Sequence, residues 1–245
     1  KDFGRVGVLM AGPSSEKKIS LKSGRAVLNA LKDKGINAVP VIIKNSSVKD
    51  NMLLLKSKNL DCAFIALHGA FGEDGGIQHI LNKLRIPYTH SGIRASRLAM
   101  DKIASRNIFR KHGLGVPSCR VIKKGSYKID NLRFSDFPLV VKPASHGSSI
   151  GLSIVENEKN ILKAIKLAFR FDSRIIIEEY IKGRELTVGI LGDKALPVIE
   201  ILPKHFFFDY QAKYKKGLTD YVVPAKLPKQ TADKVRREAL LAHKL

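Results

Sequence analysis

Apolar runs alternate with amphipathic stretches along the first third of the chain. Three runs, at residues 5–10, 38–43 and 60–67, have the length and composition of buried strands. Between the first two, apolar positions recur at helical spacing from Ser20, the expected cap, to about residue 34. A strand, loop, helix and strand in this order open a doubly wound sheet, in which ligands lie beyond the carboxyl ends of the strands. The pattern therefore predicts an α/β fold that begins with such a sheet.

The rest of the chain has shorter and more varied elements. In chain order we expect a helix over 76–84, a short strand over 86–89, a helix over 94–112, a strand over 116–122, a polar loop over 123–137, a hairpin over 139–155, a helix over 157–171, a strand over 174–181, two antiparallel strands over 186–191 and 195–202, and a helix from Thr231. The segment 206–217 is too rich in aromatic side chains for an ordinary solvated loop. We interpret it as an ordered lid over a site.

The hairpin carries the most distinctive chemistry. An apolar run, 139–141, is ended by Lys142 and followed by a glycine- and serine-rich tip at 145–149. Backbone N–H groups and hydroxyls on such a tip suit phosphate oxygens, and Lys142 supplies positive charge. The tip is not a Walker A loop, because it lacks the G-x-x-x-x-G-K-[ST] spacing and the helix directly after it. A mobile turn beside a surface lysine explains the same residues, so the pattern leaves both interpretations open.

Composition limits the class of protein. The 245 residues include 44 Lys and Arg against 22 Asp and Glu, a formal charge of +22. The basic residues are scattered, which favours a general compositional bias over a dedicated nucleic-acid surface. No apolar run approaches the roughly 20 residues of a membrane span. Cys62 and Cys119 fit no metal or redox spacing, and we expect them to be reduced, small core residues of a cytosolic protein.

Eight groups of short motifs occur in one order over almost the whole chain. They lie at 12–16 with 20–24, 66–69 with 72–75, 87–92, 100–102, 141–143 with 147–151, 177–180, 183–185 and 208–214. Together they resemble the ATP-grasp superfamily and, within it, the D-alanine:D-alanine ligases of peptidoglycan synthesis. Each motif alone is weak, and it is their shared order that makes the resemblance specific.

The resemblance implies an ATP-grasp fold behind a Rossmann-like amino-terminal domain. It divides the chain into a substrate domain at 1–94, a central ATP-grasp subdomain at 95–183 and an incomplete carboxyl-terminal subdomain at 184–245. The implied reaction is the ATP-dependent ligation of two D-alanines through an acyl phosphate, for cell-wall synthesis and cell shape. It also implies Mg²⁺ or Mn²⁺ as cofactor and a cytoplasmic homodimer with no nucleic-acid or membrane partner.

The resemblance also assigns roles to individual residues. Glu16, Ser148 and Tyr214 match the trio that orients D-alanine and ties down the lid, with Glu16 on the ammonium group and His68 near the carboxylate of the first D-alanine. The implied ATP-binding residues are Lys102, Lys142, Ser148, Ser149, Glu178, Glu179, Tyr180, Ile181, Glu185 and Lys213. From the residues alone, the helix dipole explains Glu16 equally well and a structural role explains His68.

Two departures from the family pattern stand out. His146 occupies a position where an acidic or amide residue is common in the family. The last family motif, which carries the metal ligands, does not appear, so we expect those ligands beyond Leu245 and expect residues 1–245 alone to be an inactive fragment. The alternatives are a D-alanyl-D-lactate ligase, disfavoured by the intact lid with Tyr214, and a noncatalytic nucleotide- or polyanion-binding protein, favoured by the charge and the absent metal motif.

Overall fold

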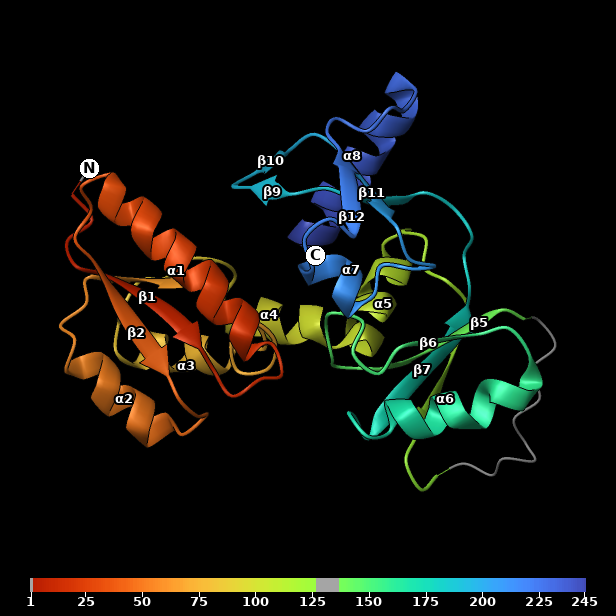
Figure 1. The fold of residues 1–245 in the computed structure, drawn as a ribbon, viewed down its shortest axis with the longest axis horizontal. Helices are drawn as coiled ribbons and strands as arrows, with labels where there is room; N and C mark the ends of the chain where they lie inside the picture. The colour runs from red at the N-terminus through yellow and green to blue at the C-terminus, as the bar shows by residue number, and fades with distance from the viewer. Residues whose placement is uncertain (1, 127–136) are drawn as a thin grey trace. The chain divides into compact units, whose positions relative to one another are not determined.

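The structure of the chain is a computed structural model that describes residues 2–126 and 137–245. The chain forms two compact units, Lys1–Asp101 and Lys102–Leu245, drawn in Figure 1 in red to yellow and in yellow-green to blue. Most of the polar loop predicted over 123–137 lies outside the described residues. The predicted division into three domains is a different partition, and it stays a prediction.

The first unit contains a parallel sheet. Its strands are β1 (Val6–Ala11), β2 (Ala38–Ile43) and β3 (Cys62–Ile65), in the order β2-β1-β3, with a further parallel bridge between Ala63 and Tyr88. Its helices are α1 (Lys17–Asp33), α2 (Val48–Lys56), α3 (Gly76–Lys83) and α4 (Ile93–Met100).

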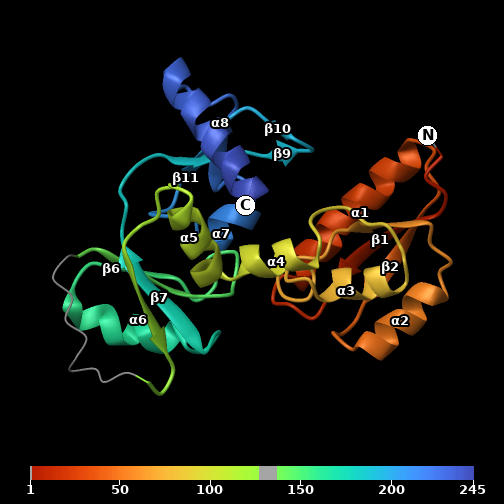
Figure 2. The same ribbon diagram turned by 180° about the vertical axis from the view of Figure 1, so that it is seen from behind.

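Helices cover both faces of this sheet because β1 is apolar on both sides. Val8 and Met10 pack with Leu28 of α1 on one face. Leu9 packs with residues of α2 and α3, among them Leu55, on the other face. Figures 1 and 2 show α1 on one side of the strands and α2 on the other. The predicted doubly wound opening is therefore confirmed.

Two details of this unit differ from the sequence prediction. Helix α1 begins at Lys17, and Ser20 is not its cap: it is fully buried, and its hydroxyl donates to the carbonyl of Ala66 at 2.7 Å. Helix α2 was not predicted at all, although Ser47 caps it by accepting a hydrogen bond from the N–H of Asp50.

The helix predicted over 94–112 is two helices, α4 and α5 (Lys102–Lys111). The break falls at Asp101, whose ψ of 99° is extended. The N–H of Lys102 leaves the helical ladder and donates to the carbonyl of Ala144 at 3.0 Å. A tertiary hydrogen bond thus ends the helical run where the two units meet in sequence.

The second unit contains a four-stranded antiparallel sheet. Its strands are β4 (Cys119–Lys123), β5 (Leu139–Pro143), β6 (Ser153–Val155) and β7 (Arg174–Glu179), in the order β4-β7-β5-β6. A 3₁₀ turn, η2 (Glu158–Asn160), leads into α6 (Ile161–Ala168), where one long helix was expected. Helix α6 covers one face of this sheet (Figure 2). On that face Val141 and Ile177 pack against Ile165. The predicted hairpin is confirmed as the β5–β6 pair.

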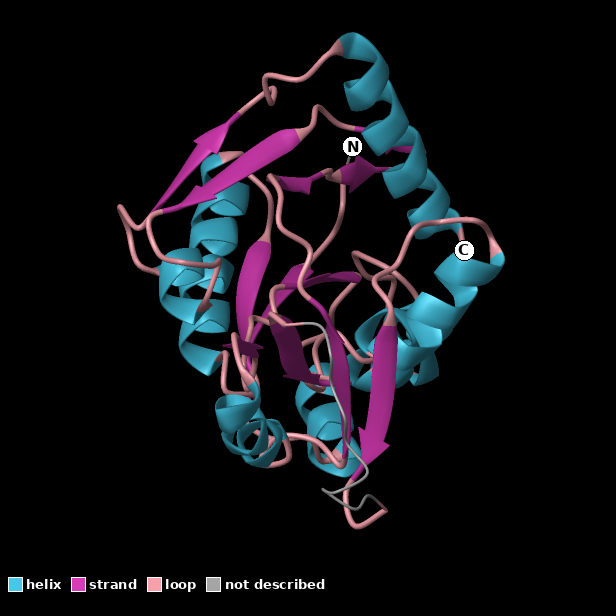
Figure 3. Ribbon diagram, turned by 90° about the vertical axis from the view of Figure 1, so that its right-hand side faces the viewer, coloured by secondary structure: helices cyan, strands magenta, loops and turns pink. Residues whose placement is uncertain are grey.

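The remaining elements surround a second antiparallel sheet. They are β8 (Glu185–Thr187), β9 (Ile190–Leu191), β10 (Lys194–Ala195), β11 (Ile199–Pro203), α7 (Tyr210–Tyr214), β12 (Thr219–Val222) and α8 (Lys229–Lys244). The sheet order is β12-β11-β8, and β9 and β10 form the predicted hairpin around Gly192. Strand β12 was not predicted. The expectation that both cysteines lie in the core is wrong, because Cys119 on β4 is exposed and Cys62 on β3 is only partly buried. Figure 3 distinguishes the strands of these sheets from the helices.

Candidate active site

Lys142 lies at the end of β5, on the sheet face opposite α6. Side chains alternate along a strand, so Leu139 and Val141 enter the core while Lys142 faces away from it. The strand register pairs Val140 with Glu178, which places Glu178 on the same face as Lys142. The Lys142 ammonium group and the Glu178 carboxylate form an ion pair. The predicted phosphate-facing lysine therefore already has an anionic partner of its own chain.

The second predicted phosphate-facing lysine is held against the same hairpin. The ammonium group of Lys102, at the start of α5, donates to the carbonyl of His146 at 2.5 Å. The structure thus brings Lys102 and the 145–149 tip together, and the phosphate role of both stays a prediction. The partners of this ammonium group include the backbone carbonyls of Ala144 and His146.

The hairpin tip is fastened to the predicted lid. Ser148 and Ser149 have left-handed φ values of 51° and 58°. The hydroxyls of Ser148 and Tyr214 are 2.8 Å apart, and Ser149 donates to the carbonyl of Phe208 at 2.9 Å. Strained non-glycine backbone of this kind persists where surrounding contacts hold it, and it is typical of ligand clamps. The tip and the lid segment therefore form one connected structure.

Helix α7 gives the lid its order. Asp209 caps it by accepting a hydrogen bond from the N–H of Ala212 at 2.7 Å. That hydrogen bond, helped by His205, lowers the pKa of Asp209 below its ordinary value. The predicted ordered lid thus has a short capped helix at its centre, with Tyr214 as its last residue.

The two acidic side chains at the end of β7 already have interaction partners. Glu178 binds Lys142, and Glu179 accepts a hydrogen bond from the N–H of Ser118 at 2.7 Å. The N–H of Tyr180 donates to the carbonyl of Pro138 at 3.2 Å, and Ile181 is 62% exposed. Glu179 and Ile181 are both exposed, so this segment can meet a ligand along these residues.

Glu185 and Lys213 influence one another electrostatically. Desolvation raises the pKa of Glu185, and the positive charge of Lys213 opposes that rise. Lys213 also lies over the Phe208 ring, 5.3 Å from its centroid. The two residues come from β8 and α7, so the structure brings together two predicted nucleotide contacts that are 28 positions apart in sequence.

In the first unit, Glu16 and His68 lie on adjoining loops at the carboxyl ends of β1 and β3. Glu16 is only 4% exposed. Ser14 joins the loops: its hydroxyl donates to the carbonyl of His68 at 2.6 Å and accepts from the N–H of Glu16 at 3.2 Å. A Cβ atom added at Gly69 would lie 2.4 Å from Glu16 Oε2, so only glycine permits this approach.

Glu73 supports this turn, a role that the sequence analysis missed. Its Oε2 atom accepts a hydrogen bond from the N–H of Gly69 at 2.9 Å. Burial, together with the nearby Glu16 charge, raises the pKa of Glu73 despite that hydrogen bond. Ser23, also without an assigned role, lies 2.9 Å from His68 Nε2. Glu73 lies in the motif at 72–75 and Ser23 in the motif at 20–24, and this membership was the signal that could have identified them.

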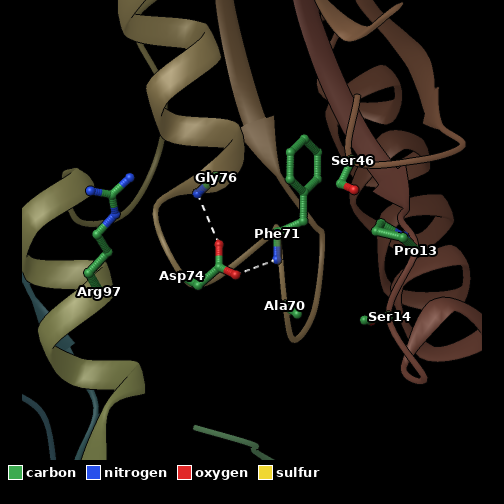
Figure 4. A pocket seen from close by; sticks show the side chains of 8 residues that line it. All are labelled: Pro13, Ser14, Ser46, Ala70, Phe71, Asp74, Gly76 and Arg97. Atoms are coloured by element: carbon green, nitrogen blue, oxygen red, sulfur yellow. Dashed lines mark hydrogen bonds between the residues drawn. The ribbon is translucent and has the colours of Figure 1, made fainter. Parts of the chain in front are cut away.

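A pocket of about 550 Å³ opens beside these loops (Figure 4). Its lining residues are Pro13, Ser14, Ser46, Ala70, Phe71, Asp74, Gly76 and Arg97. The Asp74 carboxylate accepts from the N–H groups of Phe71 at 2.8 Å and Gly76 at 2.9 Å, the dashed lines of Figure 4. This arrangement holds Phe71 at a left-handed φ of 71°. The pocket lies where doubly wound sheets bind their ligands.

Some predicted relationships are not tested by this arrangement. Glu16 belongs to the first unit and Ser148 with Tyr214 to the second, so the complete trio stays a prediction. Within the described ranges 2–126 and 137–245, no group of three or more His, Cys, Asp or Glu is placed to hold a metal ion. In the same residues no helix is long and apolar enough to cross a membrane.

Three features define a nucleotide-dependent enzyme of the ATP-grasp class. They are an antiparallel hairpin that carries a lysine, a second lysine held against the hairpin tip, and a lid segment with a capped helix bound to that tip. Two family models match the chain: "D-ala D-ala ligase N-terminus" over residues 44–91 and "D-ala D-ala ligase C-terminus" over residues 108–245. The chain belongs to the D-alanine–D-alanine ligase family.

Individual relatives agree with this membership. The D-alanine–D-alanine ligase of Geotalea uraniireducens is 46% identical over 98% of this chain and 76% of its own length. The crystal structure of the Bacillus anthracis ligase has a TM-score of 0.84 and 38% identity over 98% of this chain and 78% of that one, and it is also known complexed with ATP. The VanG D-Ala:D-Ser ligase of Enterococcus faecalis has a TM-score of 0.77 and 26% identity, covering 98% of this chain and 82% of that one. The chain spans about three quarters of the length of these relatives.

Proposed function

We propose that this protein joins two D-alanines to D-alanyl-D-alanine at the expense of ATP, for peptidoglycan synthesis. The observation that carries the proposal within the family is the hydroxyl contact of 2.8 Å between Ser148 and Tyr214. It couples a phosphate-type hairpin to a lid, which is the arrangement needed to handle a water-sensitive intermediate.

The reaction has two steps. A carboxylate oxygen of the first D-alanine attacks the γ-phosphorus of ATP, the bond from that phosphorus to the bridging oxygen breaks, and ADP leaves. The amine nitrogen of the second D-alanine, after losing a proton, attacks the acyl carbon, and the carbon–oxygen bond breaks to release phosphate. Both steps bring anions together, so catalysis depends on positive charge and positioning.

The residues of this chain divide that task between them. We assign Lys142 and Lys102 to the phosphates, with Ser148 and Ser149 closing over them. We assign the backbone at Glu179, Tyr180 and Ile181, with Glu178 behind it, to the adenine, Glu185 to the ribose, and Lys213 to the nucleotide from the lid. Glu16 takes the ammonium group of the first D-alanine and His68 lies near its carboxylate. The burial of Glu16 and its anchoring through Ser14 support this role, because a buried carboxylate favours a cationic partner.

Mg²⁺ or Mn²⁺ is the expected companion of ATP, and it would neutralise the phosphate oxygens. The described residues do not provide a cluster of ligands for it. We expect its ligands to follow Leu245, and we expect residues 1–245 alone to form no dipeptide. We further propose a cytoplasmic homodimer, because ATP is the substrate and the family resemblance implies a dimer.

For the domains, we propose that the second unit divides near residue 183 into two ATP-grasp subdomains. Its two separate antiparallel sheets, β4-β7-β5-β6 and β12-β11-β8, support that division. The nucleotide would then contact both sheets, since Lys142 belongs to the first and Glu185 to the second.

The test is a product balance in the full-length protein with ATP, Mg²⁺ and D-alanine. We expect one ADP and one phosphate for each D-alanyl-D-alanine. Offering D-lactate or D-serine as the second substrate separates dipeptide synthesis from its ester-forming and serine-using relatives. Nucleotide binding without any ligated product would favour the noncatalytic alternative and contradict the proposal.

A further inference from the structure

A single buried carboxylate in the second unit serves two cations. Oε1 of Glu178 forms an ion pair with the ammonium group of Lys142. Oε2 of Glu178 forms a second ion pair, with Nη1 of Arg106, at 2.5 Å. The side chains of Glu178, Arg106 and Lys142 are 7%, 10% and 20% exposed. The three residues come from β7, α5 and β5.

The two cations are held in different ways. Arg106 is fixed at a second point, because its other terminal nitrogen donates to the carbonyl of Pro117. Its guanidinium group remains charged at any working pH. Lys142 has a flexible stem and a compact ammonium group, and it is the more exposed of the two. Of the two, Lys142 is therefore the cation free to change partners.

A change of partner raises a problem of charge balance. If Lys142 were the only cation beside Glu178, moving the lysine ammonium group to another anion would leave a buried carboxylate with no counter-ion, which is strongly unfavourable. Arg106 removes that penalty, because it remains on Glu178 after Lys142 has left.

We infer that Arg106 is a positioning residue that keeps Glu178 charge-balanced, so that Lys142 can transfer from Glu178 to a nucleotide phosphate. The inference rests on the proposed function, because it takes Lys142 as the phosphate ligand. Arg106 itself touches no substrate. It lies four residues after Lys102 on α5, so one helix supplies both the second lysine and this supporting charge.

The test measures binding of two probes, ATP with Mg²⁺ and adenosine, by calorimetry on the full-length protein. Arg106→Met should weaken ATP binding about tenfold or more. The phosphate must then compete for Lys142 with a Glu178 carboxylate that has no other counter-ion. Adenosine affinity should change less than about threefold. Arg110→Met, an exposed arginine on the same helix, is the matched control and should leave both affinities unchanged.

A second substitution separates charge balance from simple support of the fold. In Arg106→Met/Glu178→Gln the buried carboxylate is gone, so the ATP affinity of this double variant should lie within about threefold of that of Glu178→Gln alone. Arg106→Lys, which retains the charge in case the methionine variant folds poorly, should also stay within about threefold. In a Lys142→Met background, Arg106→Met should cause no further loss of ATP affinity.

The outcomes are distinguishable. If Arg106→Met weakens ATP binding as much in the Glu178→Gln background as in the wild type, or if adenosine affinity falls as much as ATP affinity, the role of Arg106 is overturned while the proposed function stays intact. If the wild type binds ATP no more tightly than adenosine, or Lys142→Met leaves that preference unchanged, the phosphate role of Lys142 fails and the inference fails with it.

Discussion

Tyr214→Phe is the most informative single change in the lid. It deletes one hydroxyl and keeps the ring, so it removes the 2.8 Å contact with Ser148. Tyr210 provides a matched control on the same helix: its ring packs edge-on against Tyr214, 4.9 Å between centroids. Among the residues that the structure describes, the Tyr210 hydroxyl has no hydrogen-bond partner.

The size of the effect follows from the contact. A part-buried neutral hydrogen bond contributes about 1 kcal/mol net, which corresponds to roughly a fivefold change in the equilibrium between a closed and an open lid. An open lid admits water to the acyl phosphate. We therefore expect the ratio of phosphate released to dipeptide formed to rise up to about fivefold in Tyr214→Phe, and to remain unchanged in Tyr210→Phe.

The assay measures phosphate and dipeptide in parallel in the full-length protein, with urea unfolding as a check on stability. Ser148→Ala should also raise this ratio, and the effects in the double variant should be less than additive, because both single changes remove the same contact. If Tyr214→Phe leaves the phosphate-to-dipeptide ratio unchanged, the lid interpretation is wrong. Additive effects in the double variant would show that the two hydroxyls act independently.

Three further changes test other parts of the site. Lys142→Ala should slow ligation by about 10²–10³, because it removes a charge aimed at the transferred phosphate, while exposed Lys166→Ala leaves the rate unchanged; near-normal turnover in Lys142→Ala excludes the phosphate role. Burial raises the pKa of Glu73, so its stabilising effect is complete below the unfolded pKa of about 4.3 and is lost as pH rises through the folded pKa; the unfolding free energy of Glu73→Gln should therefore rise relative to the wild type as pH increases from about 4.3 through that folded pKa, and a pH-independent difference contradicts this. Asp209→Ala removes the cap of α7 at a cost of about 1 kcal/mol, which should speed hydrogen exchange at the Ala212 amide about fivefold; unchanged exchange would mean that the cap does not hold the lid helix.

Local patterns predicted the parts of the site that are local. The β5–β6 hairpin with Lys142 followed from an apolar run, a glycine-serine tip and a second run, because strand pairing across a short loop needs no distant information. The lid was predicted from its aromatic content, and α7 lies within it. Helix α2 was missed despite a recognisable cap at Ser47.

Tertiary contacts determined what the sequence could not show. The apolar stripe continues through Asp101, and only the hydrogen bond from Lys102 to Ala144 reveals that the helix stops there. Ser20 has the chemistry of a cap but is used to bind the carbonyl of Ala66. The pairing of Arg106 with Glu178 joins residues 72 positions apart, so it depends on how α5 packs against β7.

The central claim, that this chain belongs to an enzyme that activates D-alanine as an acyl phosphate, has one direct test. The full-length protein is given ATP, Mg²⁺ and D-alanine with both carboxylate oxygens replaced by ¹⁸O, and the isotope content of the released phosphate is measured. Because the carboxylate oxygen bonds to the γ-phosphorus and leaves with it, the account predicts one ¹⁸O in the phosphate for each dipeptide formed. Dipeptide synthesis with unlabelled phosphate would contradict it.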